Sequence, residues 1–163
     1  MKMFCCFAGT FLLFAAMTLQ AELPTKKVLT LGMAKKLVAA AEAEAKKRRA
    51  TVVIAVVDDG GQLILLERLD DTQVASVEVA IGKARTAAIF RRPSKVFEDQ
   101  VKNGPVAALA LPGATPLQGG IPITVEGKVT GAVGASGNSP QEDEEIALAG
   151  AAVTASAVQE EGR

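Results

Sequence analysis

The chain of 163 residues is poor in reactive side chains, since it contains no histidine, tryptophan or tyrosine. Its two cysteines, Cys5 and Cys6, lie in an apolar N-terminal segment, and residues 22–163 contain none. Without histidine or cysteine, this part of the chain can build neither a Ser-His-Asp or Cys-His nucleophile nor a zinc site with nitrogen and sulfur ligands. Disulfide bonds within it are excluded as well. Only carboxylate or lysine chemistry remains, and no recognisable catalytic motif accompanies it, so the sequence makes no case for an enzyme.

Net charge is also lacking, because 18 basic residues balance 18 acidic ones. Proteins that bind nucleic acid through its phosphates carry a basic surface, and single-stranded bases stack on aromatic side chains. This chain has no excess of positive charge, and its only aromatic residues are six phenylalanines. Nucleic acid is therefore not an expected partner.

The first residues form a short apolar segment. Lys2 is followed by an apolar run of 15 residues from Met3 to Met17, and a polar chain begins after Ala21. This arrangement is typical of a secretory signal peptide, whereas a membrane-spanning helix needs about 20 apolar residues. We predict a signal peptide over residues 1–21, a single domain over residues 22–163, and a periplasmic or secreted protein. A retained anchor is the alternative.

The rest of the chain alternates between helical and extended patterns. Apolar residues at helical spacing mark helices, β-branched runs mark strands, and glycine and proline mark connections. In chain order, the predicted elements are a helix over 31–49, strands over 51–57 and 62–67, helices over 74–92 and 95–103, a short edge strand within 106–120, strands over 121–125 and 128–135, and a final helix from Pro140. This order favours an α+β fold with a mostly antiparallel sheet and helices packed on it.

Polar residues mark three helix starts. Thr30 and Ser94 are predicted N-caps. Ser139 and Glu142 form a capping box around Pro140, which suits the first helical position. These signals define where the first, third and final helices begin.

Three glycines recur at steps of three: Gly131, Gly134 and Gly137. A dinucleotide-binding fingerprint needs glycines that open a helix after a strand, so that backbone N–H groups converge on a pyrophosphate. Glycines along a strand do not converge, because successive residues alternate between its two faces. We interpret them as clearance for a neighbouring backbone, and expect that neighbour to be the alanine-rich final helix. Contact with a ligand is the alternative.

The second predicted helix carries four residues on one stripe, at steps of four, three and four: Glu78, Gly82, Arg85 and Ile89. A guanidinium beside the gap left by Gly82 is suited to anchor a carboxylate, and Glu78 completes this candidate ligand site. A surface or interface ion pair is the alternative interpretation. Lys83 points elsewhere and is expected to reach solvent.

The acidic start of the final helix has two interpretations. Asp143 with Glu144 or Glu145 offers carboxylate oxygens, the ligands that hard cations and iron accept. No loop spacing typical of a cation site accompanies them. The alternative is a solvated first turn whose negative charge complements the helix dipole.

Four ordered blocks of sequence resemble one protein family. They are "AVVDDGGQLILLERLD", "ASVEVAIGKARTAAIFRRPS", "LALPGATPLQGGIPITVEGKVTGAVGASG" and "QEDEEIALAGAA". Over residues 29–158 the chain resembles the GlcG/HbpS-like family of haem-binding proteins, to which haem degradation is also ascribed. The resemblance implies a five-stranded, mostly antiparallel, profilin-like sheet flanked by helices in the order αββααβββα. It also implies a homo-oligomer, dimer or larger, and binding of haem and iron in some exported members.

The resemblance leads us to expect an exported oligomer that binds haem or a related tetrapyrrole. Some members ligate haem through histidine, which this chain lacks, so Thr115 is the implied candidate ligand, with Met33 and carboxylates as further candidates. The alternative is a binding module for a small carboxylate metabolite, held by Arg85 and the amides of Gly113, Gly119 and Gly120. A third interpretation makes the small-residue surface an assembly interface without a ligand.

Overall fold

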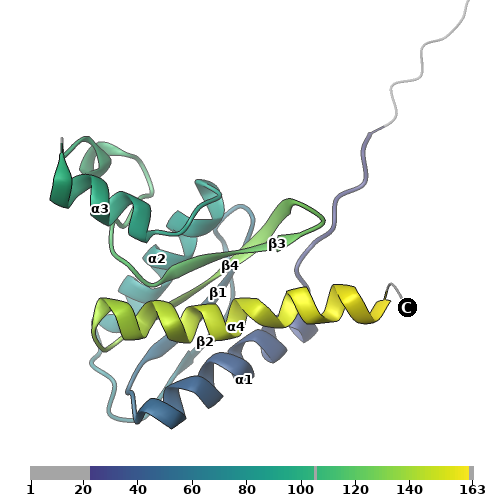
Figure 1. Ribbon diagram of the computed structural model, residues 1–163, viewed down its shortest axis with the longest axis horizontal. Helices are drawn as coiled ribbons and strands as arrows, with labels where there is room; N and C mark the ends of the chain where they lie inside the picture. The colour runs from purple at the N-terminus through teal and green to yellow at the C-terminus, as the bar shows by residue number, and fades with distance from the viewer. Residues whose placement is uncertain (1–22, 105, 162–163) are drawn as a thin grey trace, which may run out of the picture.

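The computed structural model describes residues 23–104 and 106–161. Within these residues, four α-helices and a short 3₁₀ helix surround a four-stranded sheet in an α+β arrangement (Figure 1). In chain order the elements are α1 (Leu31–Arg48), β1 (Val53–Asp58), β2 (Leu63–Arg68), α2 (Ser76–Ile89), α3 (Lys95–Asn103), η1 (Val106–Ala110), β3 (Gly120–Val125), β4 (Lys128–Ser136) and α4 (Pro140–Glu161). The predicted signal peptide over residues 1–21 lies outside the described part.

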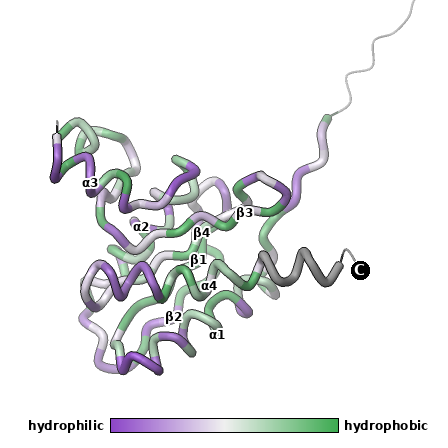
Figure 2. The backbone as a smooth tube through the Cα atoms, viewed as in Figure 1, coloured by the Kyte–Doolittle hydropathy of each residue, from purple (hydrophilic) through white to green (hydrophobic). Residues whose placement is uncertain are grey.

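The sheet is antiparallel throughout, in the strand order β2-β1-β4-β3. Helices α1 and α4 cover one face and α2 covers the other, which gives three layers (Figure 1). The central strand β1 is therefore buried from Val53 to Val57. Its alternate side chains enter different cores: Ile54 packs beneath α1 and α4, and Ala55 packs beneath α2. Figure 2 shows the resulting concentration of hydrophobic residues along β1 at the centre of the molecule.

Two of the three predicted helix caps are confirmed. Thr30 accepts a hydrogen bond from the N–H of Met33 (3.2 Å) at the start of α1. At α4, the Ser139 hydroxyl donates to the Glu142 carboxylate (2.7 Å), and each residue's N–H points to the other's side chain at 3.4 Å. This hydrogen bonding lowers the pKa of Glu142. Ser94 occupies the N-cap position of α3 as predicted, but its side chain makes no capping hydrogen bond.

The expected fifth strand is absent from the described residues. The segment predicted to hold an edge strand within 106–120 instead forms η1 and an irregular loop, and β3 begins only at Gly120. Pro112 and Pro116 explain the difference, because proline has no N–H for a strand ladder and Gly113 between them adopts a positive φ of 77°. The loop that replaces the strand lies against α2, where it contributes to the site described below.

A pair of glycines brings α2 into backbone contact with the sheet. Gly120 of β3 and Gly134 of β4 are register partners, and α2 lies directly over them. A Cβ atom at Gly134 would overlap the carbonyl oxygen of Ala80, and one at Gly120 would overlap that of Lys83. We call this pair the glycine platform. It holds α2 closer to the strands than any side chain between them would permit.

The interpretation of the three repeated glycines as clearance is confirmed, but the expected neighbour is wrong. Gly134 makes room for α2, not for the final helix. Gly131 and Gly137 face backbone carbonyl groups of residues 57 and 51. The final helix α4 makes its own close contact through Gly150. A Cβ atom at Gly150 would lie 3.0 Å from the Leu37 carbonyl oxygen of α1. Glycines therefore permit close backbone contact in both helical layers: Gly134 beneath α2, and Gly150 between α4 and α1.

We predict that Gly134→Ala destabilises the protein by about 1–3 kcal/mol, because the new methyl group would force α2 away from the sheet. The free energy of unfolding in denaturant measures the effect. Gly32→Ala is the matched control, since a Cβ there meets nothing closer than 3.8 Å and alanine favours helix. Equal free energies of unfolding for Gly134→Ala and Gly32→Ala would contradict the claim that the glycine platform is needed for the close contact of α2 with the sheet.

Candidate functional site

The outer side of α2 meets a loop and a turn at residues that the sequence had singled out. A Cβ atom at Gly82 would overlap the Thr115 hydroxyl, and one at Gly113 would lie 3.2 Å from the side chain of Ile89. Gly61, in the turn between β1 and β2, likewise abuts Arg85. These contacts bring together what we call the α2–loop surface: Gly61, Gly82, Arg85, Ile89, Gly113 and Thr115.

The loop is fastened to α2 through Thr86, a residue that the sequence analysis missed. The Thr86 hydroxyl accepts a hydrogen bond from the N–H of Thr115 (2.7 Å) and donates to the carbonyl of Gly82 (2.8 Å). Thr86 is fully buried, so these bonds are shielded from water. The only signal in the sequence was a threonine inside a helix, four residues after a glycine. This anchor fixes where the Thr115 side chain lies.

Arg85 is held by the turn between β1 and β2. Its Nε donates to the carbonyl of Gly61 at 3.2 Å, and its side chain is partly buried. No carboxylate pairs with it within the described residues, so its terminal nitrogens remain available for an anionic group. Glu78, placed on the same stripe by the sequence, is exposed and makes no ion pair with Arg85 in this part of the chain.

The prediction that Lys83 reaches solvent is wrong. Lys83 is 4% exposed, and its Nζ lies 2.8 Å from the Asp143 carboxylate and 3.1 Å from the Ala135 carbonyl. Asp143 is 2% exposed. Burial raises the pKa of Asp143, while the Lys83 ammonium group acts in the opposite direction. Helix α2 is thus joined to the start of α4 by a buried ion pair.

Gly119 and Gly120 were also predicted to bind a ligand, but Gly119 borders this ion pair and Gly120 meets the backbone of Lys83, not Arg85. A Cβ atom at Gly119 would lie 3.0 Å from the Lys83 ammonium nitrogen and from Asp143. The N–H of Gly120 already donates to the Ser94 hydroxyl (2.8 Å), which itself donates to the Leu117 carbonyl (2.6 Å). Of the three predicted glycines, only Gly113 lies on the α2–loop surface.

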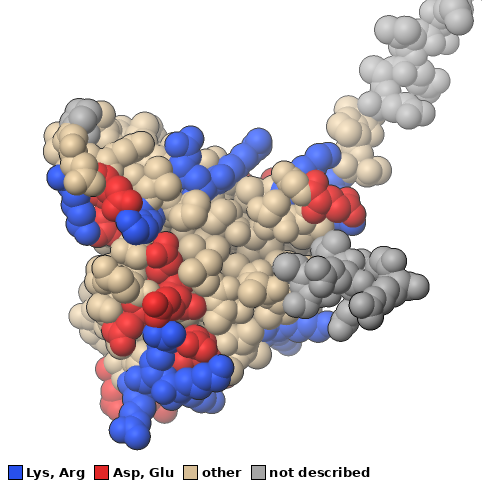
Figure 3. All heavy atoms as spheres, viewed as in Figure 1, with Lys and Arg blue, Asp and Glu red and all other residues tan. Residues whose placement is uncertain are grey.

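The acids predicted as cation ligands have other partners. The second oxygen of Asp143 accepts from the N–H of Asn138 (3.0 Å), and Glu144 accepts from the side-chain amide of Gln118. Figure 3 shows charged groups of both signs over the start of α4 and the end of α1, where Glu145 pairs with Arg48. The described residues contain no group of three or more acids, histidines or cysteines arranged for a metal ion. The cation site at Asp143 and Glu144 stays a prediction.

We predict that Lys83→Met costs about 3–5 kcal/mol of unfolding free energy, because it leaves the Asp143 carboxylate buried without its partner. The double variant Lys83→Met/Asp143→Leu should lose much less, since no buried charge remains. Chemical denaturation of the wild type, both single variants and the double variant measures the coupling. Additive losses would show that the pair does not interact.

The same variant gives a pH test. Without the Lys83 ammonium group, the pKa of Asp143 in the folded state rises further above 3.8, its value in the unfolded chain. At pH values between these two pKa values, the folded state of Lys83→Met binds more protons than the unfolded state. The stability of Lys83→Met relative to wild type should therefore recover as the pH falls through that range. A deficit that stays constant would exclude a buried carboxylate as its cause.

The chain is similar in sequence and in fold to known proteins. A family model described as "Haem degrading protein HbpS-like" matches residues 29–152. The chain belongs to this HbpS-like family. Among curated proteins, it is 44% identical over 112 residues to Protein GlcG of Escherichia coli K12, an alignment that covers 69% of this chain and 84% of GlcG.

Solved structures of HbpS-like proteins share this architecture. A double mutant of Streptomyces reticuli HbpS is 34% identical and superimposes with a TM-score of 0.74, covering 85% of this chain and 97% of that one. The crystal structure of a PduOC:Heme complex is 25% identical with a TM-score of 0.70, covering 77% of this chain and 94% of that one. No helix in the described part of the present chain is long and apolar enough to cross a bilayer.

Proposed function

We propose that this HbpS-like protein binds haem, or a related tetrapyrrole, at the α2–loop surface. The proposal is supported by the family assignment and by the similar PduOC protein, whose structure was solved as a heme complex. The observation in this chain that carries it is the grouping of exposed aliphatic side chains, an arginine and a threonine oxygen on one surface. Each of these suits a different part of haem.

The aliphatic groups would hold the porphyrin ring. Ile89 is 36% exposed, and Leu111, in the turn that also contains Gly113, is 37% exposed. Gly113 places this turn against Ile89. Large apolar side chains left in water next to each other are typical of binding surfaces, and burying each against a ligand contributes about 1.5–3 kcal/mol.

Arg85 would hold a propionate group. Its Nε is already oriented by the Gly61 carbonyl, so the planar guanidinium group needs little further ordering to receive a carboxylate. Gly61 itself has a positive φ of 78° and admits no Cβ beside Arg85. The turn is therefore shaped to accept this side chain.

Thr115 is the ligand that the α2–loop surface offers to haem iron. The bound cofactor would supply a metal centre that the protein's own side chains do not provide. Met33 packs against the core beneath α1 and α4, on the other face of the sheet from α2. Thr115 lies on the α2–loop surface and is held there by the Thr86 anchor. A neutral hydroxyl is a weak ligand, so the porphyrin contacts and Arg85 would supply most of the affinity.

A hemin titration of the full chain tests the proposal. We expect a saturable change in the Soret absorbance, and about tenfold weaker binding in Arg85→Gln, equivalent to the loss of one charge-assisted contact. Thr115→Val should alter the Soret position of the complex, because it removes the hydroxyl and keeps the side-chain shape. Thr51→Val, at an exposed threonine before β1, is the matched control. The absence of a saturable change in the wild-type protein would refute haem binding.

The structure gives less support to the alternative that the protein binds a small carboxylate metabolite. It relied on Arg85 together with the amides of Gly113, Gly119 and Gly120, but Gly119 borders Lys83 and Asp143, and Gly120 meets the backbone of Lys83. Arg85 with Gly113 alone offers few donors. No observation at the α2–loop surface favours a small carboxylate over haem.

We also propose that the protein is exported and acts as a homo-oligomer, dimer or larger, in haem or iron handling. The apolar segment ending at Ala21 supports export. Intact mass spectrometry of protein from the periplasm or medium of an expressing cell should show a chain that begins at Glu22. A chain that keeps residues 1–21 in the membrane fraction would favour the anchor.

A further inference from the structure

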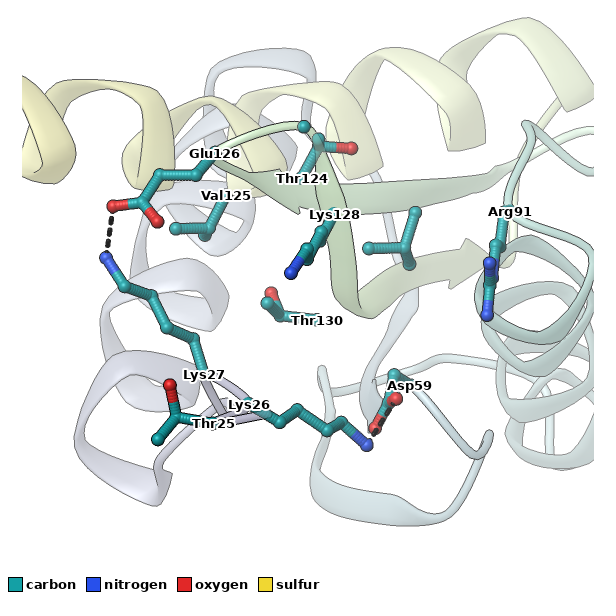
Figure 4. Close-up of a pocket in the computed structure, with 12 residues that line it drawn as sticks. Thr25, Lys26, Lys27, Asp59, Arg91, Thr124, Val125, Glu126, Lys128 and Thr130 are labelled. Carbon is teal, nitrogen blue, oxygen red and sulfur yellow. Dashed lines mark hydrogen bonds and ion pairs between the residues drawn. The ribbon is translucent and has the colours of Figure 1, made fainter. Parts of the chain in front are cut away.

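A second candidate site is lined by none of the residues of the α2–loop surface, although both sites use the turn between β1 and β2 and the end of α2. A cavity of about 810 Å³ opens between the N-terminal segment before α1, the turn between β1 and β2, the residue after α2, and the hairpin of β3 and β4 (Figure 4). This volume is in the range of known small-molecule sites, about 300–1,000 Å³. Neither the family assignment nor the haem proposal gives this cavity a role.

Two ion pairs build one wall of the cavity from the N-terminal segment. Lys26 lies 2.5 Å from the Asp59 carboxylate in the turn between β1 and β2. Lys27 pairs with Glu126 at the tip of the hairpin of β3 and β4. Figure 4 shows the segment held at these two points, with the cavity between them and the sheet. The segment thereby turns an open surface into a walled site.

The side chains that line the cavity carry a net positive charge even with both ion pairs formed. Arg91 and Lys128 also line the cavity, and neither has a carboxylate partner within the described part of the chain. The six charged residues of the lining thus carry two more positive than negative charges: Lys26, Lys27, Arg91, Lys128, Asp59 and Glu126. In a chain with no net charge, this local excess marks the cavity as a site for an anion.

The backbone at Arg91 terminates α2 in a strained conformation. Arg91 follows α2 with φ of 56°, and the N–H groups of residues 91 and 92 bond back to the carbonyls of Ala88 (3.3 Å) and Ala87 (3.2 Å). Glycine is the usual residue at this position, and a residue with a Cβ costs about 1–2 kcal/mol there. The Arg91 side chain lies at one side of the cavity (Figure 4). Arg49 ends α1 in the same left-handed conformation, so the conformation itself marks the end of a helix.

We propose that this cavity binds a small organic dicarboxylate. Arg91 would form paired N–H···O bonds with one carboxylate, and Lys128 would attract the other. The two cations come from different elements and stand apart in the cavity (Figure 4). Two separate charges match a molecule with two separate carboxylates better than a single phosphate, which is typically held by converging backbone N–H groups.

Isothermal titration calorimetry of the full chain, with succinate as the probe, tests the proposal. We expect saturable binding with a dissociation constant of about 1 mM or tighter, and about tenfold weakening in Lys128→Gln. Acetate and inorganic phosphate, at matched ionic strength, should bind more weakly. Arg92→Gln is the matched control, because it removes a neighbouring arginine that does not line the cavity.

Arg91→Gly separates binding from folding. Glycine relieves the left-handed strain, so the ligand-free variant should melt at a higher temperature than wild type while it loses succinate binding. Lys128→Gln changes β4 and not the end of α2, so its response to hemin should be unchanged, which keeps this test independent of the haem proposal. Succinate binding that survives both Arg91→Gly and Lys128→Gln, or the absence of binding in wild type, would overturn the proposal. Tighter binding of phosphate than of succinate would overturn the choice of a dicarboxylate.

Discussion

The contact between α2 and the sheet at the glycine platform is the constraint on which both candidate sites depend. Gly120 and Gly134 face α2 without side chains, so the helix backbone rests on the strands. This contact fixes the height and rotation of α2. The outward stripe with Arg85 and Ile89 then meets the loop before β3, and Arg91 at the helix end meets the cavity. Lys83, on an inward side, has space only for a fully buried ion pair.

Much of the fold could be predicted from the sequence, because local patterns determine it. Periodicity located the four α-helices and four strands of the described residues, and the capping box at Ser139 gave the start of α4. The segment over 106–120 contains Leu109 and Leu111 at the spacing of a strand, but Pro112 and Pro116 cannot join a ladder, so the predicted edge strand does not form there. The fifth strand implied by the family resemblance is likewise not found in the described residues.

The candidate site was predictable only in part, for a different reason. The stripe of Gly82, Arg85 and Ile89 follows from helical geometry alone. The partners of these residues do not, since Gly82 and Ile89 meet the loop before β3 and Arg85 meets the turn between β1 and β2, 24 residues earlier in the chain. Helical periodicity likewise could not reveal that Lys83 meets Asp143, 60 residues away. The sequence identifies a face of a helix, and tertiary packing decides whether that face meets solvent, a ligand or another charge.

The ion pairs of this protein differ in their exposure to solvent. The pair of Lys83 and Asp143 is sealed from water, so dissolved ions screen it little. The pairs of Lys26 with Asp59 and of Lys27 with Glu126 join side chains that are exposed or, for Asp59, partly exposed, where screening is effective and each contact is worth little. Rising ionic strength would therefore loosen the wall formed by residues 25–27 while the three layers stay intact. Salt thus becomes a control on access to the cavity that leaves the fold in place.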